Sequence, residues 1–295
     1  MGMNLIKIVF SSDNNFVEQL AVAICSILIN STPDENFKFY ILDGGITAKN
    51  KEQIKYLKKI KDFQLEFVEI NQEDFKDCPI SKHFKLPTYF RLKLPTLLSE
   101  DKILYMDCDI IVLKSIKELF DIDLDKFYCA CVEDFTNIFH STKQHAQCLG
   151  VNRYFNAGIA LFNLKKMKND RIEEKNFEFI KKSPEKIRNV DQCVLNHVFK
   201  EKILFVDKFW NFQYNNAIRD INCQFFKNYK NIKILHFACG NKPWTFKSIH
   251  PATLLWYYYL AKTPFKKSFL WVLLNILKCT IKKIIITFHI ATSIF

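Results

Sequence analysis

The chain has 295 residues, of which 49% are hydrophobic and 25% charged, so it can bury the core of one large α/β domain or of two small ones. Its 29 Phe and only 6 Gly exclude collagen-like and low-complexity proteins. The net charge of +12 is uneven, because eleven Lys and no Asp or Glu follow Asp220, which leaves about +1 on the first 220 residues.

The first seventy residues alternate between apolar runs and helical patterns. LIKIVFSSD (5–13) predicts a buried strand that ends in a polar loop, and apolar residues at helical spacing follow over 16–31. FKFYILDGG (37–45) repeats the strand and loop, ITAKNKEQIKYLKKI (46–60) predicts a helix with a polar face, and QLEFVEIN (64–71) predicts a third strand. This order predicts a parallel, doubly wound α/β sheet, whose ligands bind at the carboxyl ends of the strands. The sequence has neither GxGxxG nor a P-loop, so a nucleotide would be held in another way.

The most informative stretch is ILYMDCDIIVL (103–113), which follows a helix predicted from Tyr89 onward. As one strand, it places Asp107 and Asp109 on the same face, about 7 Å apart. Two like charges on an apolar strand favour a cation in front of them, and Mg²⁺ or Mn²⁺ takes oxygen ligands while leaving positions open for phosphates. The alternative is a surface strand end with two solvated carboxylates.

Five stretches, in this order, resemble glycosyltransferase family 8, the retaining transferases that include lipooligosaccharide α-galactosyltransferases, α-glucosyltransferases of the lipopolysaccharide core and glycogenins. They span residues from about 5 to 245 and read IVFSSDNNF, TYFRLKL, ILYMDCDIIVL, YFNAGIALFNL with DQCVLN, and LHFACGNKPW. The resemblance implies a single α/β domain of the GT-A type over residues 1–250, with a doubly wound, mainly parallel sheet that binds a nucleotide sugar.

The resemblance also implies roles for the residues at matching positions. Asp107, Asp109 and His236 would bind the metal, Mn²⁺ or Mg²⁺, and Asp191 and Gln192 would act in catalysis. The donor, UDP-galactose or UDP-glucose, would be contacted by Ser11, Asp13, Asn15, Arg91, Asp107, Cys108, Asp109, Glu133, Asn156, Ala157, Gly158, Asp191, Gln192, Gly240 and Lys242.

Several of these residues have simpler alternatives. His236 follows an apolar strand and could be an ordinary core histidine. Residues 156–158 could form a turn, since Asn and Gly tolerate left-handed conformations. Asp191 could cap the helix that starts there, and Arg91 could lie on the surface.

Three departures from the family pattern bear on the chemistry. Cys239 stands at a usual glycine position, and Gly240 follows one residue later. Cys193 stands where many relatives carry an aspartate, and Glu133 where a shorter aspartate is common. Without a carboxylate at position 193, the sequence favours front-face attack by the acceptor hydroxyl over a covalent intermediate.

Ten cysteines are scattered through a chain that opens without the apolar segment of a secretory signal. We therefore expect free thiols and a catalytic part in the reducing cytoplasm. Cys129 and Cys131 lack a second pair of zinc ligands, so they are expected in a buried strand rather than at a metal.

Residues 251–295 predict a basic, aromatic and amphipathic tail that is helical. From Pro264 onward no apolar run approaches the roughly twenty residues of a membrane span. At helical pitch, an apolar stripe and a polar side separate, with Leu270, Leu273, Leu277, Ile281 and Ile284 on the stripe and Lys267, Asn275, Lys278 and Lys282 on the polar side. This pattern predicts an interfacial helix on the anionic inner face of the cytoplasmic membrane, and the alternative is a helix packed on the body. No nucleic-acid-binding motif accompanies the charge, so no nucleic acid partner is expected.

These features predict a metal-dependent, retaining hexosyltransferase. It would move galactose or glucose from a UDP-sugar to a lipid-linked oligosaccharide, such as the lipooligosaccharide or lipopolysaccharide core, as a peripheral membrane enzyme. The alternative is a non-catalytic protein on the same fold that binds a sugar nucleotide or a polysaccharide.

Overall fold

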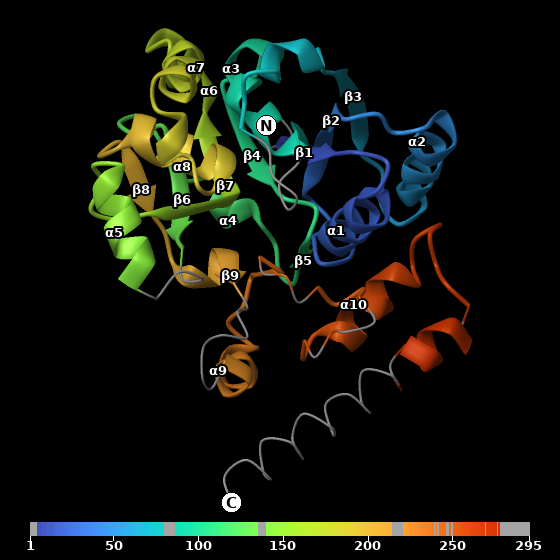
Figure 1. Ribbon diagram of the computed structural model, residues 1–295. Helices are drawn as coiled ribbons and strands as arrows, with labels where there is room; N and C mark the ends of the chain where they lie inside the picture. The colour runs from blue at the N-terminus through green and yellow to red at the C-terminus, as the bar shows by residue number, and fades with distance from the viewer. Residues whose placement is uncertain are drawn as a thin grey trace, which may run out of the picture.

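The computed structural model describes residues 5–79, 86–134, 140–213, 221–238, 240, 242–245, 248, 250–268, 270–275 and 277. At its centre lies a seven-stranded sheet with the order β3–β2–β1–β4–β7–β6–β8 (Figure 1). Its strands are β1 (Leu5–Ser12), β2 (Asn36–Asp43), β3 (Gln64–Glu69), β4 (Lys102–Met106), β6 (Cys129–Glu133), β7 (Phe155–Asn163) and β8 (Ile203–Phe205). The pairs β1–β2, β2–β3, β1–β4 and β6–β8 are parallel, whereas β7 runs antiparallel to β4 and β6. The predicted α/β fold with a mainly parallel sheet is confirmed.

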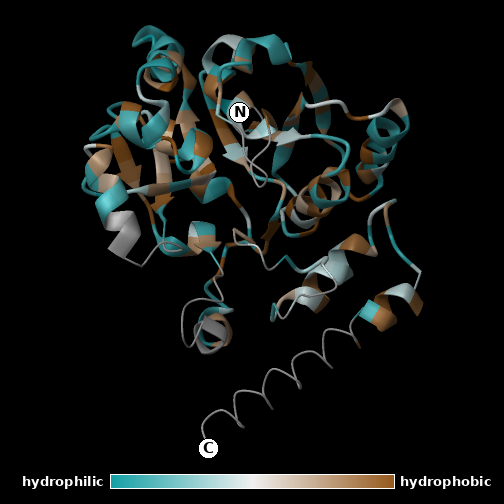
Figure 2. Ribbon diagram, in the orientation of Figure 1, coloured by the Kyte–Doolittle hydropathy of each residue, from teal (hydrophilic) through white to brown (hydrophobic). Residues whose placement is uncertain are grey.

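Strand side chains alternate between two apolar cores, one on each face of the sheet. Ile8 and Phe10 of β1 enter one core, and Val9 between them enters the other. Because both faces are buried, the strands are apolar almost throughout, and Figure 2 shows hydrophobic residues gathered on the strands and on α1 (Val17–Ile29).

Helices cover both faces of the sheet; those labelled η are 3₁₀ helices. The core containing Ile8 takes α1, α2 (Ala48–Lys55), η1 (Tyr56–Lys59), α4 (Lys117–Phe120), η5 (Lys208–Asn211), α9 (Ile221–Asn228) and α10 (Thr253–Leu260). The opposite core takes η2 (Gln72–Phe75), η3 (Leu86–Lys93), α3 (Leu94–Leu97), α5 (His140–Cys148), α6 (Leu164–Asn169), α7 (Ile172–Lys182) and α8 (Val190–Phe199), with η4 (Pro184–Lys186) leading into α8. The helices predicted over 16–31 and 46–60 are confirmed, and the one predicted from Tyr89 is mainly 3₁₀.

A second, three-stranded sheet has the order β5 (Ile110–Val112), β10 (Ile234–His236) and β9 (Phe212–Gln213). The prediction of one continuous strand over 103–113 is therefore wrong. The Asp107 N–H still donates to the Gly158 carbonyl of β7, at 2.7 Å, but after this point β5 pairs antiparallel with β10 instead. The two aspartates thus lie in the break between two sheets, and not on one face of a single strand.

Seven cysteines in the described part of the chain carry free thiols, namely Cys25, Cys78, Cys108, Cys129, Cys131, Cys148 and Cys193. Cys129 and Cys131 lie in β6 and are buried, with their sulfur atoms 3.8 Å apart. The prediction that this pair belongs to a buried strand is confirmed.

The segment from residue 251 onward starts as part of the body. Helix α10 packs against α1 and buries Trp256, Tyr257 and Tyr259 in the core, leaving Tyr258 51% exposed. Three aromatic residues of the predicted tail are therefore core residues and not part of a membrane-facing surface.

The residues that follow α10 combine packing with exposure. Lys267 forms an ion pair with Glu18 of α1, and the ring centroid of Trp271 lies 6.1 Å from that of Tyr257. The stripe of leucines points outward, with exposed fractions of 64% for Leu270, 38% for Leu273 and 48% for Leu277. Lys278, Ile281, Lys282 and Ile284 lie outside the described residues. Within the described ranges, no helix is both long and apolar enough to cross a bilayer.

Candidate active site

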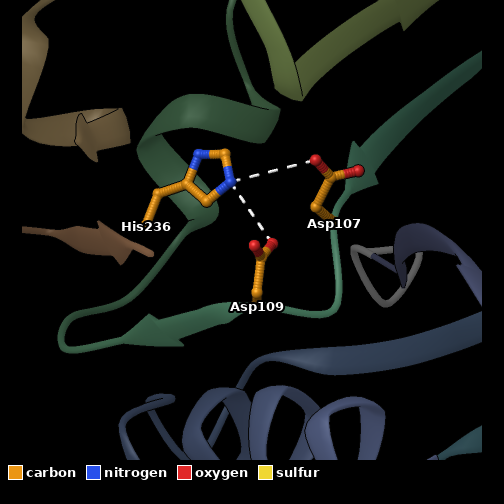
Figure 3. A group of neighbouring side chains, drawn as sticks. All are labelled: Asp107, Asp109 and His236. Carbon is orange, nitrogen blue, oxygen red and sulfur yellow. Dashed lines mark ion pairs between the residues drawn. The ribbon is translucent and has the colours of Figure 1, made fainter. Parts of the chain in front are cut away.

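Three side chains of metal-ligating type meet in the break between the two sheets (Figure 3). Asp107 follows β4, Asp109 precedes β5 and His236 ends β10. The His236 Nε2 lies 3.3 Å from Asp109 Oδ1 and 3.8 Å from Asp107 Oδ2, and the ligand atoms of the three residues lie within 4.8 Å of one another. Neither strand could form this group alone, because the carboxylates and the imidazole come from segments more than a hundred residues apart.

The cluster fits a hard divalent cation. Two carboxylates and one imidazole are ligands that Mn²⁺ and Mg²⁺ accept. Burial acts to raise the pKa of Asp109, but Lys242 and His236 outweigh it and hold that pKa below its usual range, so the carboxylate is charged. Gly158 provides the space, since a Cβ there would stand 2.3 Å from His236 Cε1 and 2.7 Å from Asp107 Oδ2.

Strand β7 is irregular beside this cluster. Cys131 of β6 pairs with Ala160, but the next residue, Val132, pairs with Asn156. Residues 157–159 thus have no partner on β6, and the strand bulges. Their backbone groups therefore make no ladder hydrogen bonds to β6 and can contact the groups of the site.

Four backbone groups of the bulge each form one hydrogen bond within the site. The Ala157 N–H donates to Gln192 Oε1 at 3.0 Å, and the Ala157 carbonyl accepts from Arg91 Nη1 at 2.5 Å. The Gly158 carbonyl accepts from the Asp107 N–H, and the Gly158 N–H donates to a neighbouring side chain of β7. One short segment therefore positions groups on η3, α8 and the β4–β5 break.

Arg91 is 2% exposed and sits between two carboxylates. Its Nη2 donates to Asp107 Oδ1 at 2.8 Å, and its Nε lies 2.9 Å from Asp191 Oδ2 while donating to the Thr88 carbonyl at 3.1 Å. Its guanidinium also stacks on the Tyr105 ring, 3.9 Å from the centroid. Burial raises the pKa of Asp191 to about 7, although Arg91 acts to lower it. The single guanidinium of Arg91 thus lies beside two carboxyl groups, those of Asp107 and Asp191.

Helix α8 begins at the cavity with a strained residue. Val190 has φ +38°, a left-handed conformation that β-branched residues rarely adopt. Asp191 and Gln192 follow in the first turn. The Gln192 Nε2 donates to Asp134 Oδ2 at 2.7 Å while its Oε1 accepts from Ala157, so both ends of the amide are fixed.

Two cavities meet at the metal-ligating cluster. The first, of about 280 Å³, is lined by residues of the bulge, of the start of α8 and of the segment after β10. The second, of about 270 Å³, is lined by residues of the β1 and β4 ends and of η3. Five residues line both, namely Thr88, Arg91, Asp107, Asp109 and Lys242. Two cavities that meet at a candidate cation site suit a ligand with two parts, whose linking group would lie beside the cation.

Comparison with known families decides the class of this site. The family model described as Glycosyl transferase family 8 matches residues 7–248. The chain belongs to this family. Family 8 enzymes are retaining glycosyltransferases that use a divalent metal, and the Asp107–Asp109–His236 cluster fits the metal site of such an enzyme.

Individual family 8 members cover most of the chain. It is 27% identical over 271 residues to General stress protein A of Bacillus subtilis, across 88% of this chain and 94% of that protein. It is 28% identical over 262 residues to the lipopolysaccharide 1,3-galactosyltransferase of Salmonella typhimurium, across 84% of this chain and 75% of that protein. The solved structure of the galactosyltransferase LgtC with donor and acceptor sugar analogues matches with a TM-score of 0.76 at 26% identity, over 90% of this chain and 99% of LgtC. The predicted GT-A type of fold is confirmed.

Most residues expected from the family 8 pattern line the first cavity. They are Arg91, Asp107, Asp109, Asn156, Ala157, Gly158, Asp191, Gln192, His236 and Lys242. Three of the simpler alternatives do not hold in the structure. Arg91 is buried rather than on the surface, residues 156–158 belong to β7 rather than to a turn, and Asn189 rather than Asp191 precedes α8.

The second cavity takes three other expected residues. It is lined by Ser11 and Asp13 at the end of β1 and by Cys108 in the β4–β5 break. Asn15 lines neither cavity; its backbone and side-chain N–H groups donate to the Asp13 carboxylate at 2.9 and 3.1 Å, so it shapes the loop. Gly240 is exposed and also lines neither cavity.

Glu133 does not reach the cavity, and this expectation needs correction. Its carboxylate pairs with Arg153 at 2.8 Å, outside both cavities. Asp134 lines the first cavity instead and contacts Gln192. The two neighbouring side chains thus point to different places, and the pairing of Glu133 with Arg153 cannot be read from the residues of β6 alone.

The structure describes one of the two cysteines, Cys193 and Cys239, that depart from the family pattern. The Cys193 sulfur lies 3.1 Å from His145 Nε2 and 3.2 Å from the Tyr154 hydroxyl, and Cys193 lines neither cavity. Its side chain is buried beneath α8, so the chemistry at this position stays out of the site. Cys239 lies outside the described residues.

Sequence reasoning missed several lining residues and one supporting residue. The lining residues are Ser12, Phe16, Pro87, Thr88, Tyr105, Asp134, Asn189, Val190 and Ala238. Five of them, Ser12, Phe16, Thr88, Tyr105 and Ala238, lie inside the quoted motifs, and Pro87 and Val190 directly flank one, so the motifs themselves were the available signal. Asn211, which contacts His236 Nδ1 at 2.9 Å, lies in no motif and carried no signal.

Proposed function

We propose that this family 8 enzyme transfers a hexose, galactose or glucose, from a UDP-sugar to a lipid-linked oligosaccharide such as the lipooligosaccharide or lipopolysaccharide core. The observation that carries the proposal is the junction of two cavities at the Asp107–Asp109–His236 cluster. A UDP-sugar has a nucleoside and a sugar on either side of a diphosphate. The uridine would occupy the cavity of Ser11 and Asp13, and the hexose the cavity of Asp191 and Gln192.

Asp107, Asp109 and His236 would hold Mn²⁺ or Mg²⁺ beside the diphosphate. Such an ion supplies electrostatic stabilisation of the charge that develops on the leaving diphosphate. Lys242 reaches the same place, because its ammonium lies 2.5 Å from Asp109 Oδ2. Arg91 adds a second fixed positive charge.

The side chains next to the sugar support retention by front-face attack. The acceptor oxygen would bond to the sugar C1 on the face from which the diphosphate oxygen departs, and the acceptor proton would leave with the diphosphate. Gln192 is the group held below the sugar, and both ends of its amide are hydrogen-bonded. Cys193 is turned away, so no carboxylate or thiolate at that position serves as nucleophile.

The tail supports a peripheral location on the inner face of the cytoplasmic membrane. Three leucines of the stripe are exposed in the described part of the tail, and lysines surround them in the sequence. Apolar burial plus attraction to anionic lipid binds such a helix to a surface. This location would bring the enzyme to a lipid-linked acceptor.

The test is a donor screen that measures UDP release from a panel of UDP-sugars with Mn²⁺, with and without a lipooligosaccharide acceptor. UDP-galactose or UDP-glucose should react, and Asp107→Asn and Asp109→Asn should each abolish turnover while weakening UDP binding only when Mn²⁺ is present. Glu133→Gln is the matched control and should retain turnover, because its carboxylate faces Arg153. UDP-sugar binding without release or transfer would contradict the proposal and indicate a binding protein.

A further inference from the structure

We propose that Asn211 is a positioning residue that fixes the tautomer of His236 for metal binding. The proposal rests on the proposed metal site. It concerns a residue behind the metal-ligating cluster that lines neither cavity. A histidine binds a metal through a nitrogen without a proton, so the group that contacts the other nitrogen decides which face of the ring is available.

A backbone N–H identifies which atom of the Asn156 amide is the oxygen. The Gly158 N–H can only donate, and it lies 3.1 Å from the Asn156 side-chain atom assigned as Oδ1. That atom must be the oxygen. The Asn211 atom 2.9 Å from the same oxygen must in turn be the amide nitrogen. The Asn211 oxygen therefore faces His236 Nδ1 at 2.9 Å.

This arrangement determines the imidazole tautomer. An amide oxygen only accepts, so His236 Nδ1 carries the proton. In the neutral ring, Nε2 then has a lone pair, which points toward Asp109 Oδ1 at 3.3 Å and Asp107 Oδ2 at 3.8 Å (Figure 3). Three electron-rich atoms facing one another are stabilised by a cation between them. The orientation of the buried Asn211 amide thus determines that His236 Nε2 is the nitrogen available to a metal.

Asn211 is held firmly enough to do this. It is fully buried, at the end of η5, and its neighbour Phe212 opens β9. Strand β9 pairs in parallel with β10, with Gln213 opposite His236. Asn211 therefore lies on the strand segment next to the histidine, and its carbonyl oxygen cannot turn away without breaking the contact with Asn156.

Three variants separate the acceptor role of Asn211 from its packing. Asn211→Leu removes both the acceptor toward His236 and the donor toward Asn156. Asn211→Asp keeps an acceptor toward His236 but loses the same donor. Asn176→Leu is the matched control, since Asn176 is also fully buried and its amide donates to the Leu92 carbonyl.

The first measurement is Mn²⁺ affinity, by titration calorimetry and by electron paramagnetic resonance. Asn211→Leu should weaken Mn²⁺ binding about 10- to 100-fold, the usual effect of losing a group that orients a ligand. Asn211→Asp should stay within a few-fold of the unmodified protein, and so should Asn176→Leu. Equal Mn²⁺ affinity in the Leu variant and the unmodified protein would overturn the proposal, as would equal weakening in the Leu and Asp variants.

The second measurement needs no variant at residue 211. Long-range ¹H–¹⁵N correlation spectra of the metal-free protein, with His236→Gln used to assign the signals, should show His236 protonated at Nδ1. A proton on Nε2 alone would also overturn the proposal, whether or not the Leu variant folds. If the unmodified protein binds neither Mn²⁺ nor Mg²⁺, the proposed metal function fails, and the tautomer measured here still decides the inference separately.

Discussion

Arg91 is a buried cation that two carboxylates share. Burial acts to lower its pKa, but Asp107 and Asp191 outweigh that effect and raise it, so the guanidinium is charged. Asp191 has less compensation, because it is fully buried and the nearby Asp107 charge adds to the effect of burial. This shared pair places a carboxyl group with a pKa of about 7 at the first cavity.

Asp191 makes the stability of the metal-free protein depend on pH. Its pKa is about 7 in the folded chain and 3.8 ordinarily, so between these values the folded state binds the proton more tightly than the unfolded state. The resulting stabilisation is fully present below pH about 4 and is lost as the pH rises toward about 7. Urea unfolding across this range should show a fall of a few kcal/mol that Asp191→Asn lacks, since one pKa unit corresponds to about 1.4 kcal/mol. Parallel stability curves for the two proteins would contradict this assignment.

Gln192 should assist transfer without being indispensable. An amide that stabilises charge contributes on the order of a few kcal/mol to the barrier, so Gln192→Ala should lower kcat about 10²- to 10³-fold and leave measurable turnover. Steady-state kinetics with UDP-sugar and acceptor give the value. Mass spectrometry that finds a sugar bound covalently to Gln192 of the unmodified enzyme would contradict front-face attack.

At single positions, the sequence predicted which residues belong to the site better than it predicted which way their side chains point. The motifs placed Arg91, Asp107, Asp109 and His236 at one site, and the structure brings them together. The direction of the side chain was not predicted at Glu133, which pairs with Arg153 while the next residue, Asp134, lines the cavity. Arg153 lies 20 residues farther along the chain, so local periodicity cannot report this pairing.

At the scale of elements, breaks in regular structure build the site. The β4–β5 break and the β7 bulge supply the metal-ligating carboxylates and the backbone groups that orient them. The first three strands and the two intervening helices could be predicted, since each has its own apolar pattern. The end of β4 could not, because ILYMDCDIIVL is apolar on both sides of the aspartates and only pairing with two different sheets divides it.

Gly158 gives a test at this scale. Gly158→Ala places a methyl group 2.3 Å from His236 Cε1, so the histidine or the bulge must move. Overpacking of this kind costs about 1–3 kcal/mol of stability, and we expect Mn²⁺ affinity to fall at least about tenfold. Thermal unfolding and calorimetry measure the two effects.

Gly45→Ala is the matched control for this variant. Gly45 has φ +105° and open space around its Cβ position, so alanine there is strained but distant from His236. It should lower stability while leaving Mn²⁺ affinity unchanged. Unchanged Mn²⁺ affinity in Gly158→Ala as well would show that the bulge does not form the metal site.

At the scale of the molecule, the C-terminal segment differs from the body in charge and exposure. Of the eleven large apolar side chains that are exposed in the described part of the chain, eight belong to residues after Asp220, where the sequence has lysines and no acids. Part of this segment packs on α1 and α10, which a helical wheel could not reveal because the packing partners lie elsewhere in the chain.

The exposed leucines test membrane association without removing that packing. Replacing Leu270, Leu273 and Leu277 together by Gln should sharply reduce sedimentation with anionic vesicles and leave UDP release unchanged, because none of them lines a cavity. The triple variant should also lose the residual binding more readily in salt. Replacement of Tyr56 and Ile60, two exposed residues beside α2, is the control and should not affect vesicle binding. Full vesicle binding by the triple variant would contradict the proposed location.

The position of the candidate metal site also affects how firmly the two sheets are held together. Asp107 is tied to the seven-stranded sheet and His236 belongs to the three-stranded one, so an ion held by both would act as a removable cross-link between them. Loading the ion at a hundredfold excess over its Kd adds about 2.7 kcal/mol to the folded state. Hydrogen–deuterium exchange should then slow most at the β5 and β10 amides, which adjoin Asp109 and His236. An ion bound at this site would thereby also stiffen the smaller sheet.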